Sequence, residues 1–204
     1  MNVYEEIYKG YKIELKQDED PPNPRTEWDN LGTIGHWHRR YNVGEVNLGR
    51  EHDSRESIEH FMQAVEKKGG VVLPIAMLDH SGITIWVGNK PHWSDSAGWD
   101  SGQVGYIWVE GSKIRQEYSV KRITKQIKAK VEEVLKSEVA TFDAYLKGDA
   151  VGFVVSKDDE ELDSCWGFYP DTDGTSVEIG HKYALEQARD MIDYRVKEDE
   201  DETV

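Results

Sequence analysis

The sequence predicts an α+β fold, in which a largely antiparallel β-sheet packs with about three main helices in a single domain. Apolar residues recur at helical spacing over residues 53–68, 124–147 and 182–197. Short apolar or alternating runs, which are typical of strands, lie between these segments. Groups of strands separated by only a few helices favour an α+β arrangement over a regularly alternating parallel one.

The N-terminal part predicts a hairpin, or one long bent strand, within residues 4–17. Tyr11, Ile13 and Leu15 alternate there with charged residues, as in a half-exposed strand. The following segment, 18–25, contains three of the six prolines and predicts a fixed irregular loop. This loop leads into residues 28–42, which are rich in Trp, His and Arg.

The first helix is expected after a capping-box pattern that starts at Asp53 and has Glu56 three positions later. Gly69 and Gly70 are expected to end it. Three apolar runs, 71–78, 83–87 and 104–109, are typical of central buried strands, and the sequence DHSG predicts a tight turn between the first two.

Two more strands are expected at 150–155 and 162–169, before the last helix. Because residues 197–204 are mostly charged, we expect them to form a disordered acidic tail behind a domain of residues 1–196.

The net charge of −15 argues against direct binding of nucleic acid and suits a partner with a basic surface. The charge is uneven: residues 111–136 hold eight basic and three acidic residues, a local balance of +5, so the remainder carries −20. The basic segment 113–136 has two interpretations. It is either a solvated helix face with pairs such as Glu132 and Lys136, or a patch for a phosphate or an acidic partner.

We expect a cytoplasmic protein without a membrane span or a cofactor. The one cysteine, Cys165, cannot form an internal disulfide, and the first twelve residues are polar rather than secretory in pattern. The longest apolar run, 71–78, is far shorter than the ~20 residues that span a bilayer. The sequence leaves the oligomeric state open.

Two histidine motifs are candidate sites. The spacing of His36 and His38 places both rings on one face of an extended segment, as in some metal sites, although a stacked or exposed pair explains it as well. Asp79 and His80 stand at a strand end, where an aspartate can orient a histidine for proton transfer. Turn chemistry is the alternative there.

Three further motifs carry weaker signals. Residues 92–105 form a polar loop without the lysine of a phosphate-binding loop, and Asp100 within it is either a turn former or a site residue. Cys165 is either a nucleophile or, as we expect, a buried structural thiol. The sequence DTDG at 171–174 is interpreted as a turn.

Five sequence blocks together resemble a family of uncharacterised proteins from bacteriophages and prokaryotic genomes. They are EDPPNPRTEWDNLGT, HRRYN, LDHSG, WDSGQVGYIWV and DSCWGFY, in this order. The resemblance covers most of the chain and carries no known activity. It implies a small, soluble accessory protein of phage type, and it transfers no catalytic residue.

Ten polar and aromatic residues are predicted to line one polar cleft at a rim of the sheet. In it, the arginines are either neutralised by Asp29, Asp100 and Asp163 as a buried ionic network, or they meet an anionic ligand group. The ten residues are Trp28, Asp29, Asn30, Arg39, Arg40, His80, Asp100, Gln103, Asp163 and Trp166.

Two functions therefore follow as hypotheses. The first is a phage-type accessory binding protein whose acidic surface inhibits a host nucleic-acid-handling defence complex, of anti-CRISPR or anti-restriction type. The alternative is a metal-assisted hydrolase of a nucleotide or phosphoester. For the hydrolase, the candidate ligands or bases are His36, His38, Asp79 and His80, with Arg39 or Arg40 on the phosphate.

Overall fold

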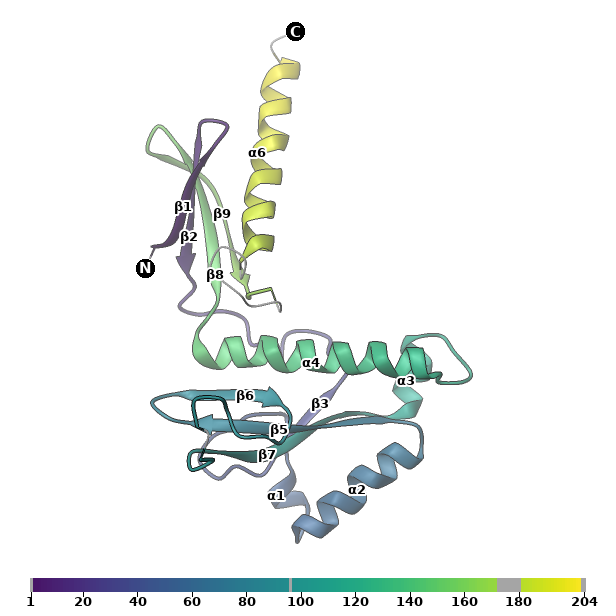
Figure 1. The fold of residues 1–204 in the computed structure, drawn as a ribbon. Helices are drawn as coiled ribbons and strands as arrows, with labels where there is room; N and C mark the ends of the chain where they lie inside the picture. The colour runs from purple at the N-terminus through teal and green to yellow at the C-terminus, as the bar shows by residue number, and fades with distance from the viewer. Residues whose placement is uncertain (1, 96, 172–180, 203–204) are drawn as a thin grey trace. The chain divides into compact units, whose positions relative to one another are not determined.

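The computed structural model describes residues 2–95, 97–171 and 181–202, and their contacts divide the chain into two compact units. Unit 1 combines both ends of the chain, Met1–Pro22 and Ala144–Val204, and unit 2 is the continuous segment Asn23–Asp143. The predicted α+β class with largely antiparallel pairing is confirmed, although the strands form two sheets, one in each unit (Figure 1). Local sequence patterns do not reveal this division, because unit 1 pairs strands from opposite ends of the chain.

Unit 1 is a four-stranded antiparallel sheet with one helix packed on it. The strands are β1 (Asn2–Tyr8), β2 (Tyr11–Gln17), β8 (Val151–Lys157) and β9 (Glu160–Phe168), and they lie in this order across the sheet. The predicted hairpin is confirmed, with its turn at Lys9 and Gly10.

Helix α6 (Lys182–Glu202) covers one face of this sheet (Figure 1). Alternate side chains of the two central strands meet the apolar stripe of the helix, as the period of two in a strand and 3.6 in a helix allows. The buried core consists of Tyr11, Ile13, Leu15, Val151, Phe153, Val155, Ala184, Leu185, Ala188 and Ile192.

Unit 2 contains a five-stranded sheet with helices on both faces. Its strands are β3 (Thr33–His36), β4 (Val46–Asn47), β5 (Val71–Asp79), β6 (Ile83–Val87) and β7 (Ser101–Val109), in the order β4-β3-β7-β5-β6. Strands β5 and β7 are central, as predicted. Strand β6 is an edge strand, so the prediction that 83–87 is a central strand is wrong, and its short apolar run did not distinguish the two positions.

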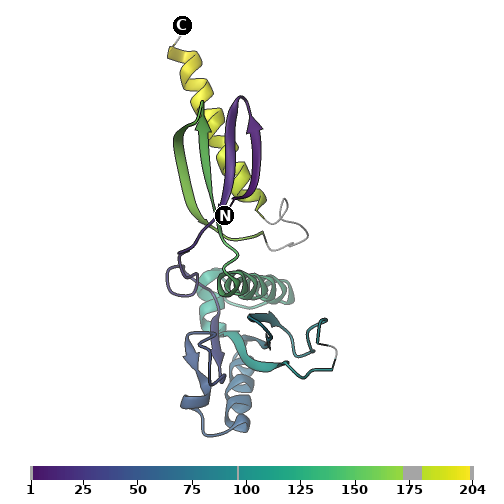
Figure 2. The same ribbon diagram turned by 90° about the vertical axis from the view of Figure 1, so that its left-hand side faces the viewer.

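The helices of unit 2 enclose the sheet, as both ribbon views show (Figures 1 and 2). Helices α1 (Leu48–Glu51) and α2 (Arg55–Lys67) pack on one face around Trp108. The long helix α4 (Lys125–Lys147) covers the other face, and α3 (Gly111–Glu117) follows β7 directly. The boundary between the units falls in the last turn of α4.

All three predicted main helices are present, with two changes at their ends. Ser54, rather than Asp53, caps α2, because its extended backbone lets its hydroxyl accept the Ser57 N–H at 3.2 Å. Helix α6 continues to Glu202, so the prediction that a disordered tail begins at residue 197 is wrong for residues 197–202. Lys and Glu are good helix formers, and extending an existing helix is easier than starting one. Residues 203–204 lie outside the described residues.

Within the described part of the chain, none of the helices has both the length and the apolar character needed to cross a bilayer.

Candidate functional site

The structure divides the predicted site residues between the two units. Asp163 and Trp166 lie inside β9 of unit 1, rather than in loops or at strand ends. The other residues lie in unit 2, in a groove beside α4, in a pocket beside α1, and in a polar cluster at the end of β5. Gln103 belongs to none of these, since its side-chain amide donates to the Gly105 carbonyl of its own strand at 3.3 Å.

A buried arginine that the sequence reading missed, Arg25, organises the loop before β3. Its side chain is 3% exposed, and its guanidinium pairs with Glu45 and with Glu138, the latter at 3.0 Å. It also donates to the Asn30 side chain and to the Gly32 carbonyl, each at 2.8 Å. A buried ionic network therefore exists, but it is built on Arg25, Glu45 and Glu138. The predicted members Arg39, Arg40, Asp29, Asp100 and Asp163 form no hydrogen bond or ion pair with these three residues.

Glu138 on α4 extends this network to the backbone of the loop. Its carboxylate accepts the N–H groups of Leu31, at 2.6 Å, and Gly32, at 3.1 Å. Hydrogen bonds to a charged group are about twice as strong as neutral ones. For the buried role of Arg25, the sequence offered one signal: the residue directly follows the proline-rich run, and prolines restrict the backbone there.

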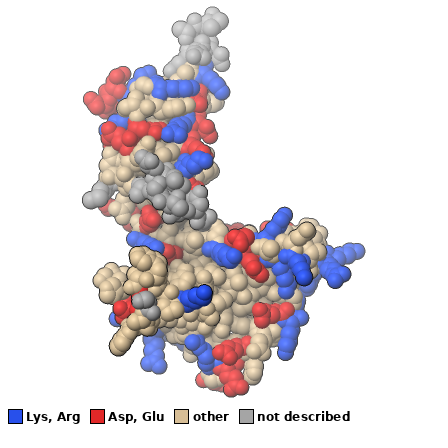
Figure 3. All heavy atoms as spheres, viewed as in Figure 1, with Lys and Arg blue, Asp and Glu red and all other residues tan. Residues whose placement is uncertain are grey.

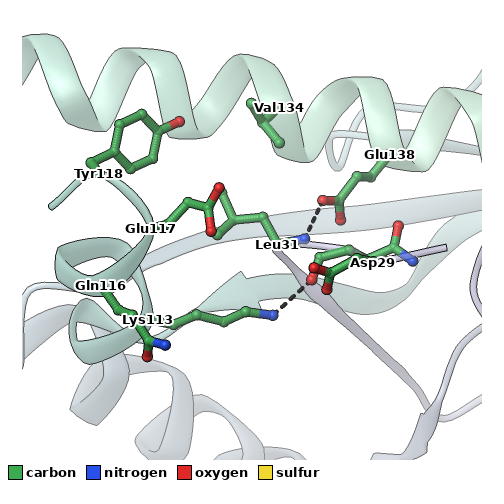
Figure 4. A pocket seen from close by; sticks show the side chains of 9 residues that line it. Asp29, Leu31, Lys113, Gln116, Glu117, Tyr118, Val134 and Glu138 are labelled. Atoms are coloured by element: carbon green, nitrogen blue, oxygen red, sulfur yellow. Dashed lines mark hydrogen bonds between the residues drawn. The ribbon is translucent and has the colours of Figure 1, made fainter.

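A groove of about 380 Å³ lies beside this fixed loop. Its walls are the loop itself, helix α3 and one side of α4 (Figure 4). Lys113 crosses the groove to donate to the Asn30 carbonyl at 2.7 Å, while the Glu117 carboxylate points into the space (Figure 4). The lining residues are Asp29, Asn30, Leu31, Lys113, Gln116, Glu117, Tyr118, Val134 and Glu138.

A second hollow of about 250 Å³ continues the groove along α4 toward Trp28. The two hollows share Asp29, Asn30, Val134 and Glu138. Trp28 is 45% exposed, so its indole presents apolar surface at the groove wall. Three of the predicted binding residues, Trp28, Asp29 and Asn30, which are consecutive in the sequence, line these hollows.

The carboxylates of the groove outnumber its one cation, Lys113, which donates to the Asn30 carbonyl rather than to a carboxylate. Glu138 is engaged by Arg25 and by backbone N–H groups, but Asp29 and Glu117 form no ion pair with any residue that the structure describes. Carboxylates beside an indole suit a lysine or arginine side chain, because the ring attracts cations and the carboxylates pair with them.

The polar cluster at the end of β5 joins four of the predicted residues. Asp79 pairs with Arg40 and lies 3.5 Å from the Tyr41 hydroxyl. His80 lies in the tight turn that the sequence predicts between β5 and β6. Its Nδ1 lies 3.0 Å from Oδ2 of Asp100, which precedes β7. The carboxylate accepts the Nδ1 proton, which leaves Nε2 of this exposed ring able to accept a proton. The cluster is a candidate general base with a neighbouring cation.

His36 and His38 have different surroundings. His36 is buried, its Nε2 lies 2.9 Å from the Asn42 side-chain oxygen, and burial lowers its pKa. His38 stacks on Tyr41 and accepts the Tyr41 N–H at Nδ1. Across residues 2–95, 97–171 and 181–202, no three His, Cys, Asp or Glu side chains are grouped so that they would hold a metal ion.

In unit 1, β9 carries the other candidates. Asp163 lies 3.7 Å from Arg195, and the Trp166 ring lies directly over Gly152. Cys165 is exposed, so the prediction of a buried structural thiol is wrong; β9 is an edge strand whose register with β8 shifts near this residue. Residues 172–174 of the predicted DTDG turn lie outside the described residues.

Charge separates the two units more clearly than any motif does. Unit 1 contains nine Lys and Arg against 23 Asp and Glu, a net charge of −14, and unit 2 contains 16 against 17, a net charge of −1. Within unit 2, the basic segment 113–136 forms α3 and the first part of α4, where Lys and Arg gather on the face shown in Figure 3. The acidic character read from the whole sequence thus belongs to unit 1.

The chain matches no protein-family profile, no curated protein and no solved structure.

Proposed function

We propose that this protein is a phage-type accessory factor that binds a basic surface on a host nucleic-acid-handling protein and thereby inhibits it. The observation that carries the proposal is the net charge of −14 on unit 1, against −1 on unit 2. A compact unit with such an excess of carboxylates can occupy a channel that normally holds phosphates.

The turn between β8 and β9 is the part of unit 1 best suited to this contact. Together with the first two residues of β9, it presents four consecutive exposed acidic residues, Asp158, Asp159, Glu160 and Glu161, which we call the acidic tip. None of the four forms an ion pair with a described residue. The nearest lysine in sequence, Lys157, lies over the Tyr11 ring instead. Carboxylates that are not neutralised within the protein remain available to a partner.

The groove in unit 2 offers a second surface that favours a positively charged group. Asp29 lines both hollows, with Glu117 in one and Trp28 in the other, and these side chains can receive a lysine or arginine. Aromatic residues dominate the energetics of many interfaces. Each unit therefore provides a surface that selects positive charge.

The test begins with tagged full-length protein in host lysate at low salt, with bound proteins identified by mass spectrometry. We expect a stoichiometric nucleic-acid-handling partner that is released by salt and displaced by a DNA duplex. A purified partner that DNA does not displace, or the absence of any partner at low salt, would contradict the proposal.

A matched pair of variants then locates the contact. Neutralising the acidic tip with D158N, D159N, E160Q and E161Q should weaken binding by at least about tenfold, because close charge pairs across interfaces are worth 1.5 kcal/mol or more. Asn is used at 158 and 159 since both residues have positive φ, which Asn tolerates. The control, E51Q, E59Q, E66Q and E133Q, removes the same charge from exposed positions of unit 2 and should bind as the wild type does.

The second candidate function is a metal-assisted hydrolase of a nucleotide or phosphoester. The specific observation in its favour is the pair of His80 and Asp100, with 3.0 Å between Nδ1 and Oδ2; the residue before His80, Asp79, pairs with Arg40. It predicts phosphoesterase activity in the presence of a divalent metal that chelator removes and His80→Ala abolishes. Activity that survives His80→Ala would exclude this cluster.

A further inference from the structure

Unit 2 contains a pocket with the opposite charge preference from the acidic tip. It lies between the segment that follows β3 and helix α1, and its volume is about 490 Å³. It is lined by Trp37, His38, Arg39, Asn47, Gly49 and Arg50, and we call it the Arg39–Arg50 pocket. Its size lies within the ~300–1,000 Å³ range of small-molecule sites.

The positive charge of this pocket is not neutralised within the protein. No acidic residue lines it, and neither Arg39 nor Arg50 forms an ion pair with a residue that the structure describes. Other arginines do have carboxylate partners, as Arg25 has Glu45 and Arg189 has Glu6. Two guanidinium groups that line one hollow without a carboxylate partner can both pair with an anion bound there.

The remaining polar groups of the pocket add donors. His38 accepts the Tyr41 N–H at Nδ1, at 3.0 Å, so in the neutral ring the proton is on Nε2, which can donate. The Asn47 side chain forms no hydrogen bond with a described residue, including at its N-cap position before α1, so its amide N–H groups can donate. The pocket thus combines two cations with neutral donors.

The wall of the pocket is held rigidly. The Arg55 guanidinium lies 3.5 Å from the centre of the Trp37 ring, and Tyr106 contacts the same ring edge-on at 5.8 Å between centroids. Gly49 approaches so closely that an added Cβ would lie 3.3 Å from the Trp37 Cβ. A wall that packing already fixes loses little entropy when a ligand binds against it.

From these contacts we propose that the Arg39–Arg50 pocket binds the phosphate group of a small ligand of nucleotide size. Guanidinium groups present paired donors that match phosphate oxygens, and a phosphate accepts from several donors at once. The proposal is independent of the acidic tip, because it uses other residues, in the other unit, and the opposite charge.

The test is calorimetric titration of the full-length protein with AMP, inorganic phosphate and adenosine at about 150 mM salt, where distant surface charges are screened. We expect saturable binding of AMP, with R39Q/R50Q weakening it at least about tenfold. The double variant R39K/R50K keeps the charge but loses the forked donors, so its affinity for AMP should lie between those of the wild type and R39Q/R50Q. The matched control R115Q/R122Q removes two exposed arginines of the basic segment and should bind as the wild type does.

The ligands separate the possible sources of the phosphate. AMP that binds more tightly than inorganic phosphate assigns the pocket to a nucleotide, and equal affinities assign it to a free phosphate; both outcomes support a phosphate site. Adenosine that binds as tightly as AMP would overturn the proposal. So would the absence of saturation, or a loss of binding in R115Q/R122Q that equals the loss in R39Q/R50Q.

Discussion

Unit 1 and unit 2 use their ionisable residues in opposite ways. In unit 1, the ion pairs are partly or fully exposed, as in Arg189 with Glu6, Lys9 with Asp193 and Lys12 with Glu5, and most of the acidic residues that the structure describes are exposed. In unit 2, which is almost neutral, Arg25 is buried between Glu45 and Glu138. Net charge and structural ion pairing are therefore separate properties. Most described carboxylates of unit 1 are exposed to solvent, whereas Glu45 and Glu138 of unit 2 hold a loop in place.

The largest effect is expected for the buried arginine of unit 2. Replacing Arg25 with Met leaves two carboxylates without their cation and should lower the free energy of unfolding by about 3–5 kcal/mol, as breaking a buried pair does. Urea unfolding monitored by tryptophan fluorescence measures it. Arg189→Met, the control in unit 1, should cost about 1 kcal/mol. Similar losses for the two variants would contradict the distinction drawn between the units.

One glycine in each unit tests how tightly the backbone of that unit is packed. A Cβ on Gly105 of unit 2 would lie 2.1 Å from the Gly35 carbonyl oxygen, which is backbone. One on Gly152 of unit 1 would lie 2.2 Å from the ring of Trp166, a half-exposed side chain, and 2.9 Å from the Cys165 carbonyl oxygen, so its closest backbone contact is looser. Gly105→Ala should therefore cost about 3 kcal/mol, and Gly152→Ala about 2 kcal/mol. Thermal unfolding compares them, and a larger loss for Gly152→Ala would show that the indole cannot move.

The surface pair of unit 1 predicts a dependence on pH. Arg189 donates hydrogen bonds to both oxygens of Glu6, each at 2.7 Å, and these hold the pKa of Glu6 below its ordinary value of 4.5. A lowered pKa stabilises the folded state above the unfolded pKa, and this stability is lost as the pH falls through the folded value.

Glu6→Gln should thus cost about 1 kcal/mol at pH 7 and progressively less below about pH 4.5. Unfolding curves of both proteins between pH 7 and pH 3 give the difference. Glu59→Gln, an exposed change on α2, should show no such trend; a constant difference for Glu6→Gln would mean that the pair does not stabilise the fold.

The smallest expected effect is that of salt. Self-repulsion in unit 1, with its charge of −14, should decrease when salt shortens the range of the field. Amide hydrogen exchange of peptides from β8 and β9 should slow by an amount equivalent to a few tenths of a kcal/mol in 0.5 M NaCl, roughly what surface charges contribute. Peptides from β5 and β7 serve as the control, and an equal change there would remove the electrostatic difference between the units.

Local sequence signals predicted the elements well where one face is buried. The apolar stripe of α4 and the alternation in β2 follow from the periods of helix and strand, and Gly69, with φ of +88°, ends α2 where its sequence position suggests. The tight turn at His80 also follows from its residues. These features depend on neighbours in sequence, which a single chain displays directly.

Features that depend on distant partners were beyond the reach of sequence patterns. Arg25 looks like an ordinary loop residue until Glu45 and Glu138 are placed beside it. The predicted cleft assumed that Asp163 and Trp166 share a sheet with Arg40, whereas they belong to different units. Of the candidate groove, Trp28, Asp29 and Asn30 were predicted, but their neighbours on α3 and α4 were not.

The discontinuity of unit 1 also sets an order for the folding of the nascent chain. Gln17 pairs with Val151, and the whole of unit 2 lies between these two residues in the sequence. Strand β2 is therefore synthesised long before its partner β8. Residues 23–143, by contrast, form a continuous segment and are all available earlier. During synthesis, the edge of β2 that later pairs with β8 stays unpaired. Lysine and glutamate alternate along β2, and charged side chains on an open strand edge disfavour pairing with other chains.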